Sequence, residues 1–233
     1  MKSKTLFFLL LVAISVFNCS KNIEYSEEFK KETSGKYLYN YDDVMEVYYV
    51  DDELRLNWRE GTFTPVVLSQ NEFFVADMYK KLRFVKHPET EKRYLSIIPE
   101  DDDGTITYDY VKVVDTFKTP STHLKEGNYQ MALNGFMKIK KQDSTSEFIN
   151  EHDFNSIGYR HLRDENYDDA IEVFKLNVAL HPTSSNVYDS LADGYRVSGD
   201  SLQAYTYYKK ALELDPTNPR AIRFIRNYES DGK

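Results

Sequence analysis

The sequence contains a single cysteine, Cys19, among its 233 residues. One thiol can form neither an internal disulfide framework nor a zinc site built from cysteines. Histidine does not supply such a site either, because no two of the five histidines lie three or four residues apart, the spacing that places two ligands on one helix face. These are His87, His123, His152, His161 and His181. We therefore expect neither a metal site nor a cofactor.

Positive charge is also in short supply. The chain has 30 Lys and Arg against 38 Asp and Glu, a net charge of −8. Binding of nucleic acid needs clustered Lys and Arg to neutralise phosphates, so we exclude nucleic acid as a partner. The acidic run EDDDG at 100–104 lacks the spaced oxygen ligands and downstream Glu of a calcium loop. A solvated hairpin turn is the expected structure there.

The apolar run from Leu6 to Phe17 is too short to span a bilayer. With Lys2 and Lys4 before it, the run predicts a signal peptide over residues 1–18. A cysteine directly after such a run resembles the lipid-acceptor cysteine of bacterial lipoproteins, although Asn18 and Phe17 depart from the small residues usual there. The resemblance implies an exported protein anchored through lipidated Cys19 to the envelope of a Gram-negative bacterium. Ser20 is compatible with delivery to the outer membrane; an ordinary secreted protein is the alternative.

A polar tether at 19–34 leads into a segment with the period of β-strands, residues 35–116. VMEVYYV at 44–50 and LRLNW at 54–58 flank the turn DDE, and they form a hairpin pattern. Similar short runs lie at 62–68, 72–76, 81–86, 93–98 and 105–113. Strands at this spacing predict an antiparallel β meander curled into a sandwich or open barrel.

From Pro120 the apolar period changes to that of helices, over a segment at 119–230. Two stretches match at an offset of 34 residues, with Phe154 under Tyr188 and Ala170 under Ala204. Each unit predicts two antiparallel helices, the second ended by a proline. The units resemble tetratricopeptide (TPR) repeats at 151–184 and 185–218, with a degenerate half repeat at 119–142 and a solvating cap helix at 219–229. The expected fold class is α+β, an N-terminal β meander followed by a short α-helical TPR solenoid.

A second resemblance concerns FKLNVALHPTSSNVYDSLADGY at 174–195, which is similar to the TPR tail of bacterial β-lactamase-related serine hydrolases. In that class a small β-rich domain precedes the tail, and SGKYLY at 34–39 is similar to its start. The resemblance implies an accessory region without the catalytic domain. No Gly-x-Ser-x-Gly elbow occurs, and Thr122 stands three residues before Lys125 where the class has a serine. We therefore expect no enzymatic activity.

The first helices of TPR units line a concave face that receives a protein or an extended peptide. By repeat position, this groove would present eight polar residues that differ from the Lys/Asn/Arg carboxylate clamp of some TPR proteins: His152, Asn155, Tyr159, Arg163, Asn186, Asp189, Asp193 and Arg196. We interpret the chain as a non-catalytic envelope lipoprotein that binds a protein partner. Two alternatives stay open: an accessory subunit of a separately encoded serine hydrolase, and a β domain that binds a small ligand or glycan near Trp58.

Overall fold

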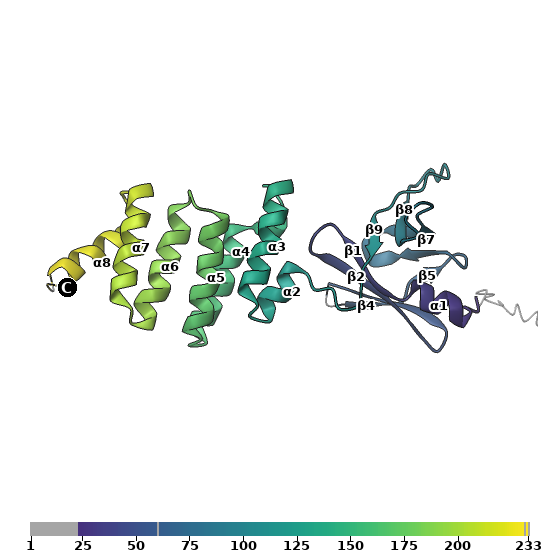
Figure 1. Ribbon diagram of the computed structural model, residues 1–233, viewed down its shortest axis with the longest axis horizontal. Helices are drawn as coiled ribbons and strands as arrows, with labels where there is room; N and C mark the ends of the chain where they lie inside the picture. Colours follow the sequence, from purple (N-terminus) through teal and green to yellow (C-terminus); the bar gives the residue numbers. More distant parts are fainter. Residues whose placement is uncertain (1–22, 60, 231, 233) are drawn as a thin grey trace, which may run out of the picture.

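The computed structural model describes residues 23–59, 61–230 and 232. The strands form one end of an elongated molecule, and the helices follow in a row toward the C-terminus (Figure 1). The predicted signal peptide at 1–18 and the predicted lipid-acceptor Cys19 lie outside the described residues. None of the described helices has the length and apolar character needed to span a bilayer.

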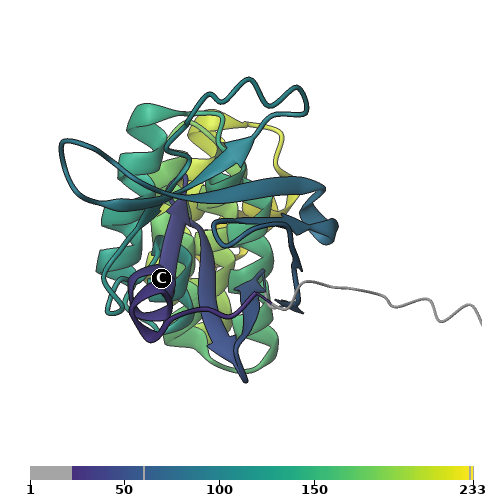
Figure 2. The same cartoon turned by 90° about the vertical axis from the view of Figure 1, so that its right-hand side faces the viewer.

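Nine strands form a single antiparallel sheet in the order β4-β3-β2-β1-β9-β8-β7-β6-β5 among the described residues. Their bounds are β1 Gly35–Tyr39, β2 Asp43–Val50, β3 Glu53–Trp58, β4 Gly61–Phe63, β5 Val66–Val67, β6 Glu72–Val75, β7 Lys80–Lys86, β8 Arg93–Ile98 and β9 Tyr110–Lys112. A 3-10 turn, η1 (Ala76–Met78), precedes β7. In the end-on view of Figure 2 the purple strands run at a steep angle to the blue and teal ones, so the sheet curls strongly.

The predicted fold class is wrong, although strands do precede the helical row. A meander would place consecutive strands side by side, but β4 and β5 lie at opposite edges of the sheet. The sheet joins two hairpin series through β1 and β9, with Leu38 opposite Val111. It is one curled sheet rather than a two-sheet sandwich. Alternation along a strand depends on which face is buried, and it carries no information on a partner more than 70 residues away.

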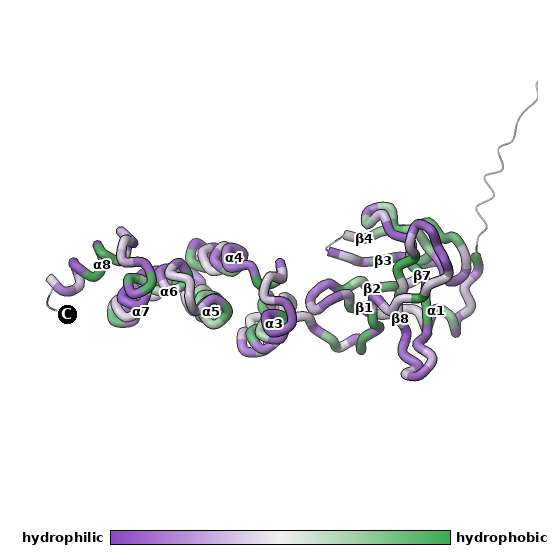
Figure 3. Tube along the Cα trace, turned by 90° about the horizontal axis from the view of Figure 1, so that it is seen from above, coloured by the Kyte–Doolittle hydropathy of each residue, from purple (hydrophilic) through white to green (hydrophobic). Residues whose placement is uncertain are grey.

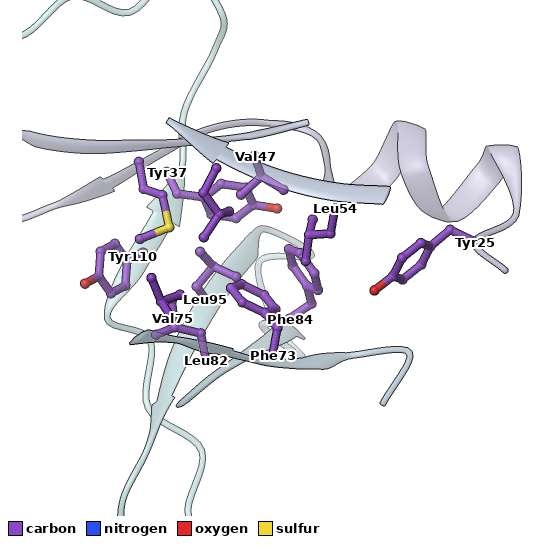
Figure 4. Close-up of a cluster of buried hydrophobic side chains, with 12 residues drawn as sticks. Tyr25, Tyr37, Val47, Leu54, Phe73, Val75, Leu82, Phe84, Leu95 and Tyr110 are labelled. Carbon is purple, nitrogen blue, oxygen red and sulfur yellow. The ribbon is translucent and has the colours of Figure 1, made fainter. Parts of the chain in front are cut away.

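The concave face of the sheet encloses the first hydrophobic core (Figure 4). Tyr37 and Val47 come from the first hairpin series, and Phe73, Leu82 and Leu95 come from the second. Each is at most 1% exposed. Because alternate residues of every strand point to this face, the curl brings both series onto one core.

Helix α1 (Glu27–Thr33) closes one end of the curled sheet. Ser26 begins it, because its Oγ accepts a hydrogen bond from the backbone N–H of Phe29 at 3.2 Å. The ring of Phe29 packs edge-on against Phe84, with centroids 5.7 Å apart. The buried Tyr37 hydroxyl donates to the carbonyl of Thr33 at 2.9 Å. These contacts fix the start of the described chain against the β part.

Seven helices follow the sheet within the described residues: α2 Pro120–Lys125, α3 Tyr129–Gln142, α4 Glu151–Arg163, α5 Tyr167–Leu180, α6 Ser185–Ser198, α7 Ser201–Leu214 and α8 Pro219–Ser230, with a 3-10 turn η2 at Glu147–Ile149. The pair α6–α7 begins 34 residues after α4–α5 at both of its helices. Seen from above, the helices stand in a row that leads away from the sheet (Figure 3). This part of the chain therefore has a TPR-like fold, with a shorter pair, α2–α3, next to the sheet.

Phe174 of α5 holds three helices together. Its ring is fully buried, and it packs against Tyr159 of α4 with centroids 5.2 Å apart. A Cβ at Gly158 would lie 2.4 Å from the ring, and one at Gly194 of α6 would lie 3.1 Å from it. The two glycines thus let neighbouring helices approach the Phe174 ring more closely than a side chain would allow.

The helical row is attached to the sheet by hydrogen bonds at the start of α2. The Asp42 carboxylate, in the turn between β1 and β2, accepts from the backbone N–H of Ser121 at 2.9 Å and from its hydroxyl. The Lys36 ammonium donates to the carbonyl of Asp115 at 2.8 Å. Arg59 lies 3.9 Å from Glu147 of η2. Asp42 therefore acts as a second cap of α2 that comes from the β part.

Replacing Asp42 with alanine is expected to loosen this attachment. Loss of a capping carboxylate costs about 1 kcal/mol, so the N–H of Ser121 should exchange with solvent about fivefold faster. Hydrogen exchange measured by NMR checks this. Asp77→Ala is the control, because Asp77 is exposed and makes no side-chain contact with another described residue. Equal exchange rates in both variants would contradict the role of Asp42.

Candidate functional site

Helices α6, α7 and α8 enclose a hollow of about 490 Å³ near the C-terminal end of the row. We call it the α6–α8 hollow, and its lining consists of Asp193, Arg196, Tyr208, Arg220, Arg223, Phe224 and Asn227. Three arginines around one concavity are unusual in an acidic chain. They make this the strongest candidate for recognition of an anionic group.

Asn218 places Arg220 at the hollow. Its side-chain oxygen accepts from the N–H groups of Arg220 and Ala221, at 3.0 and 3.1 Å, and so begins α8. Its amide also donates to Asp189 of α6 at 2.9 Å. Pro219 suits the first turn because its fixed φ is helical and no N–H is needed there. One side chain thus begins the last helix and ties that helix to α6.

The Arg220 guanidinium bridges three groups from two other helices. One of its nitrogens lies 3.1 Å from the Tyr159 hydroxyl, 3.1 Å from Asp193 and 3.3 Å from Asp189. The two carboxylates are only 10% and 12% exposed. Burial raises the pKa of Asp189, although the charge of Arg220 and the amide of Asn218 act to lower it. Burial acts to lower the pKa of Arg220, but the Tyr159 hydrogen bond and the two aspartates raise it on balance.

Asp193 is bonded on both oxygens. Arg196 donates to Oδ1 through two nitrogens at 2.8 and 2.6 Å, and the buried Tyr208 hydroxyl lies 3.4 Å from the same oxygen. Arg220 takes Oδ2. Arg223, by contrast, is exposed and has no hydrogen bond, ion pair or ring contact with any described residue. Arg196, Arg220 and Arg223 set against Asp189 and Asp193 leave one positive charge in excess, so the α6–α8 hollow suits a carboxylate.

The structure brings together four of the eight residues predicted for the groove. Tyr159, Asp189, Asp193 and Arg196 meet around Arg220, as described above. The other four do not join them. They are His152, Asn155, Arg163 and Asn186.

Those four residues are separated for simple reasons. Asn155 is buried and accepts from the amide of Asn177 at 3.0 Å, so it serves the helix packing. Asn186 donates to Glu151 at 2.8 Å on the surface. His152 and Arg163 lie at opposite ends of α4, about 16 Å apart at 1.5 Å per residue. Binding of a partner by any of the eight stays a prediction.

Sequence reasoning missed the contribution of α8, which was expected only to be a solvating cap helix. Arg220, Arg223 and Arg226 follow one another at intervals of three, a spacing that gathers side chains on one side of a helix. That spacing was the available signal. The repeat alignment hid it, because α8 has no counterpart in the preceding unit.

The remaining candidate residues have structural partners. One face of the Trp58 ring is covered by the Arg59 guanidinium, 4.7 Å from its centroid, and the indole N–H donates to Asp43 at 2.6 Å. In the acidic turn, Asp102 pairs with Arg83 at 3.3 Å. His181 contacts the carbonyl of Ile149 at 2.9 Å. Within the described residues, no group of three His, Cys, Asp or Glu side chains could hold a metal ion.

One serine–lysine pair with the spacing of the β-lactamase-related class does occur, at the very end of the sequence: Ser230 and Lys233. Lys233 lies outside the described residues. The Ser230 hydroxyl donates to the carbonyl of Asn227 at 2.8 Å, an ordinary bond at a helix end. No role is assigned to the pair.

No protein-family model matches the chain, and no curated protein matches it in sequence. Among solved structures, the first TPR of Spaghetti (RPAP3) bound to HSP90 peptide SRMEEVD is 20% identical, with a TM-score of 0.34, over 48% of this chain and 86% of that one. MamA is 23% identical, with a TM-score of 0.34, over 48% of this chain and 64% of that one. The second TPR domain of human RPAP3 in complex with HSP70 peptide SGPTIEEVD is 17% identical, with a TM-score of 0.33, over 47% and 88%. The chain is thus similar to TPR domains over about half its length, at a level too low to decide what it binds.

Proposed function

We propose that this chain is a non-catalytic lipoprotein of the cell envelope of a Gram-negative bacterium, and that its TPR-like helices bind a protein or an extended peptide. The observation that supports it best is the α6–α8 hollow. A rigid, hydrogen-bonded frame around Arg220 presents one guanidinium, that of Arg223, without a partner among the described residues. A carboxylate of the partner would accept from it, with Arg196 beside it, in a charge-assisted hydrogen bond.

The test is a pull-down from envelope extracts with the wild-type chain and two variants. Arg223→Glu reverses the charge that faces the hollow, while Arg226→Glu makes the same change on α8 outside the lining. We expect one partner to be retained by wild type and Arg226→Glu and lost by Arg223→Glu. A synthetic peptide with the partner's acidic segment should bind Arg223→Glu at least about tenfold more weakly than wild type, which is about 1.4 kcal/mol.

Two outcomes of this pull-down would contradict the proposed site. Equal capture by all three proteins would leave the hollow without a role. A partner lost equally from both variants would mean that the net charge of α8 matters and the hollow does not. Recovery of a serine hydrolase would identify the chain as an accessory subunit. The glycan alternative has no comparable support, because one face of the Trp58 ring is already covered.

Lipid attachment has its own test. Purified from membranes, the wild-type chain is expected to begin at Cys19 and to carry the extra mass of bound lipid, whereas Cys19→Ser carries none. Mass spectrometry of the intact proteins measures this. An unmodified Cys19 in the membrane-derived protein would rule out the anchor.

A further inference from the structure

The outer face of the sheet carries an apolar hollow of about 730 Å³ at its β5 edge. Val66, Phe74, Lys81 and Ile98 lie opposite one another across β5, β6, β7 and β8. Leu68 and Tyr79 stand at its margin. We call these six residues the β5–β8 patch. Val66, Leu68 and Tyr79 are 57%, 48% and 80% exposed, so apolar surface gathers here instead of being scattered singly.

Tyr79 is held outward by its backbone. Its φ is +49°, in the left-handed region that bulky residues rarely adopt. Its N–H closes the turn η1 onto the carbonyl of Ala76 at 3.0 Å, and its ring stands edge-on to Phe74 with centroids 5.8 Å apart. A side chain held this way yet 80% exposed gains little from burial within the fold. Such a residue points to contact with something outside the chain.

The described chain begins beside the β5–β8 patch. Ile23 lines a second hollow, of about 310 Å³, together with Val66 and Leu68. Cys19 precedes Ile23 by four residues, a length that spans about 14 Å at most. Helix α1 and strand β5 lie at the end of the molecule opposite the C-terminus (Figures 1 and 3). A lipid on Cys19 would therefore hold the β5–β8 patch at the membrane surface and leave the α6–α8 hollow far from it.

We propose that the β5–β8 patch rests on the lipid surface, with Tyr79, Leu68 and Val66 inserted among the headgroups; this inference rests on the proposed attachment through Cys19. Tyrosine suits that depth because its ring is apolar and its hydroxyl stays hydrated. Lys81 crosses the apolar row with its aliphatic stem and can extend its ammonium to a lipid phosphate. The contact would fix the orientation of the whole molecule, with the helical row projecting away from the membrane.

The test places a tryptophan at the patch in the full chain, purified from membranes and reconstituted into vesicles of phosphatidylethanolamine and phosphatidylglycerol with brominated acyl chains. Bromine quenches tryptophan only at close range. Tyr79→Trp is expected to lose about half of its added emission, as suits a side chain inserted to the depth of an interfacial anchor. The matched control is Tyr41→Trp, which is 39% exposed at the turn next to Asp42 and the helices. Its emission should be unchanged, like that of native Trp58.

Flotation of the vesicles separates this inference from the attachment itself. Wild type that floats while Tyr79→Trp is unquenched would overturn the inference and leave the anchor intact. Quenching of both variants would mean that the chain lies flat on the membrane, which also overturns it. Wild type that does not float would remove the anchor and the inference together. Emission from Tyr79→Trp that is shifted to the blue before vesicles are added would mean that protein covers the patch, again a contradiction.

Discussion

Replacing Phe174 with alanine lowers the free energy of unfolding of the helical row by about 3–5 kcal/mol, the range for a buried phenylalanine. Phe174 is fully buried, and its ring touches α4 and α6 at the two glycines that face it. The cavity left by alanine cannot close easily, because three helices meet on the ring. Urea unfolding followed by helical circular dichroism measures the change.

A control and a reciprocal variant sharpen this prediction. Leu202→Ala, at a position 62% exposed on α7, should change stability by less than about 0.5 kcal/mol. Gly158→Ala should destabilise even though alanine favours helix by about 1 kcal/mol, because its Cβ would overlap the Phe174 ring. Its cost should fall in a Phe174→Leu background. A loss below about 1 kcal/mol for Phe174→Ala would contradict the packing described here.

Replacing Arg220 with glutamine is expected to cost about 1–3 kcal/mol at pH 7, the penalty for leaving buried polar groups without a partner. Arg220 itself is half exposed, and solvent screens part of its charge, so the lower half of that range is more realistic. The cost arises at Asp189 and Asp193, whose carboxylates stay buried when the guanidinium is removed. Unfolding at a series of pH values measures it.

The pH dependence has a definite sign. Without Arg220, burial acts unopposed by that charge, so the pKa of Asp189 should rise further above its unfolded value near 3.9. A carboxyl with a raised folded-state pKa contributes stability at low pH and loses it as pH rises through that pKa. The deficit of Arg220→Gln should therefore shrink as the pH falls from 7 toward about 4. Arg226→Gln should show almost no deficit, and an equal deficit for Arg220→Gln at both pH values would contradict the buried-carboxylate explanation.

The sequence predicts the helical row better than the sheet. Helix pairs repeat their own pattern, so the 34-residue offset of Phe154 and Tyr188 reappears in the starts of α4 and α6. Strand runs were recognisable by alternation, but their order was not. Pairing of β1 with β9 is decided by how two hairpin series share a core, and residues such as Tyr37 and Leu95 carry no local mark of it.

The candidate site divides in the same way. Tyr159, Asp189 and Asp193 were found by their repeat positions. Arg220 was not, because it lies on the helix that ends the repeat and reaches back to the earlier pairs. Asn155 illustrates the opposite error, since a repeat position expected to face a partner is buried against Asn177.

The central claim is that a partner occupies the α6–α8 hollow, and crosslinking in living cells tests it most directly. A photoreactive amino acid replaces Asn227, which lines the hollow and whose side chain has no described partner. The control position is Lys209 on α7, which is exposed and outside the lining. We predict one adduct from position 227 that is absent from position 209 and is lost when Arg223→Glu is added. No adduct from position 227, or the same adducts from both positions, would contradict the claim.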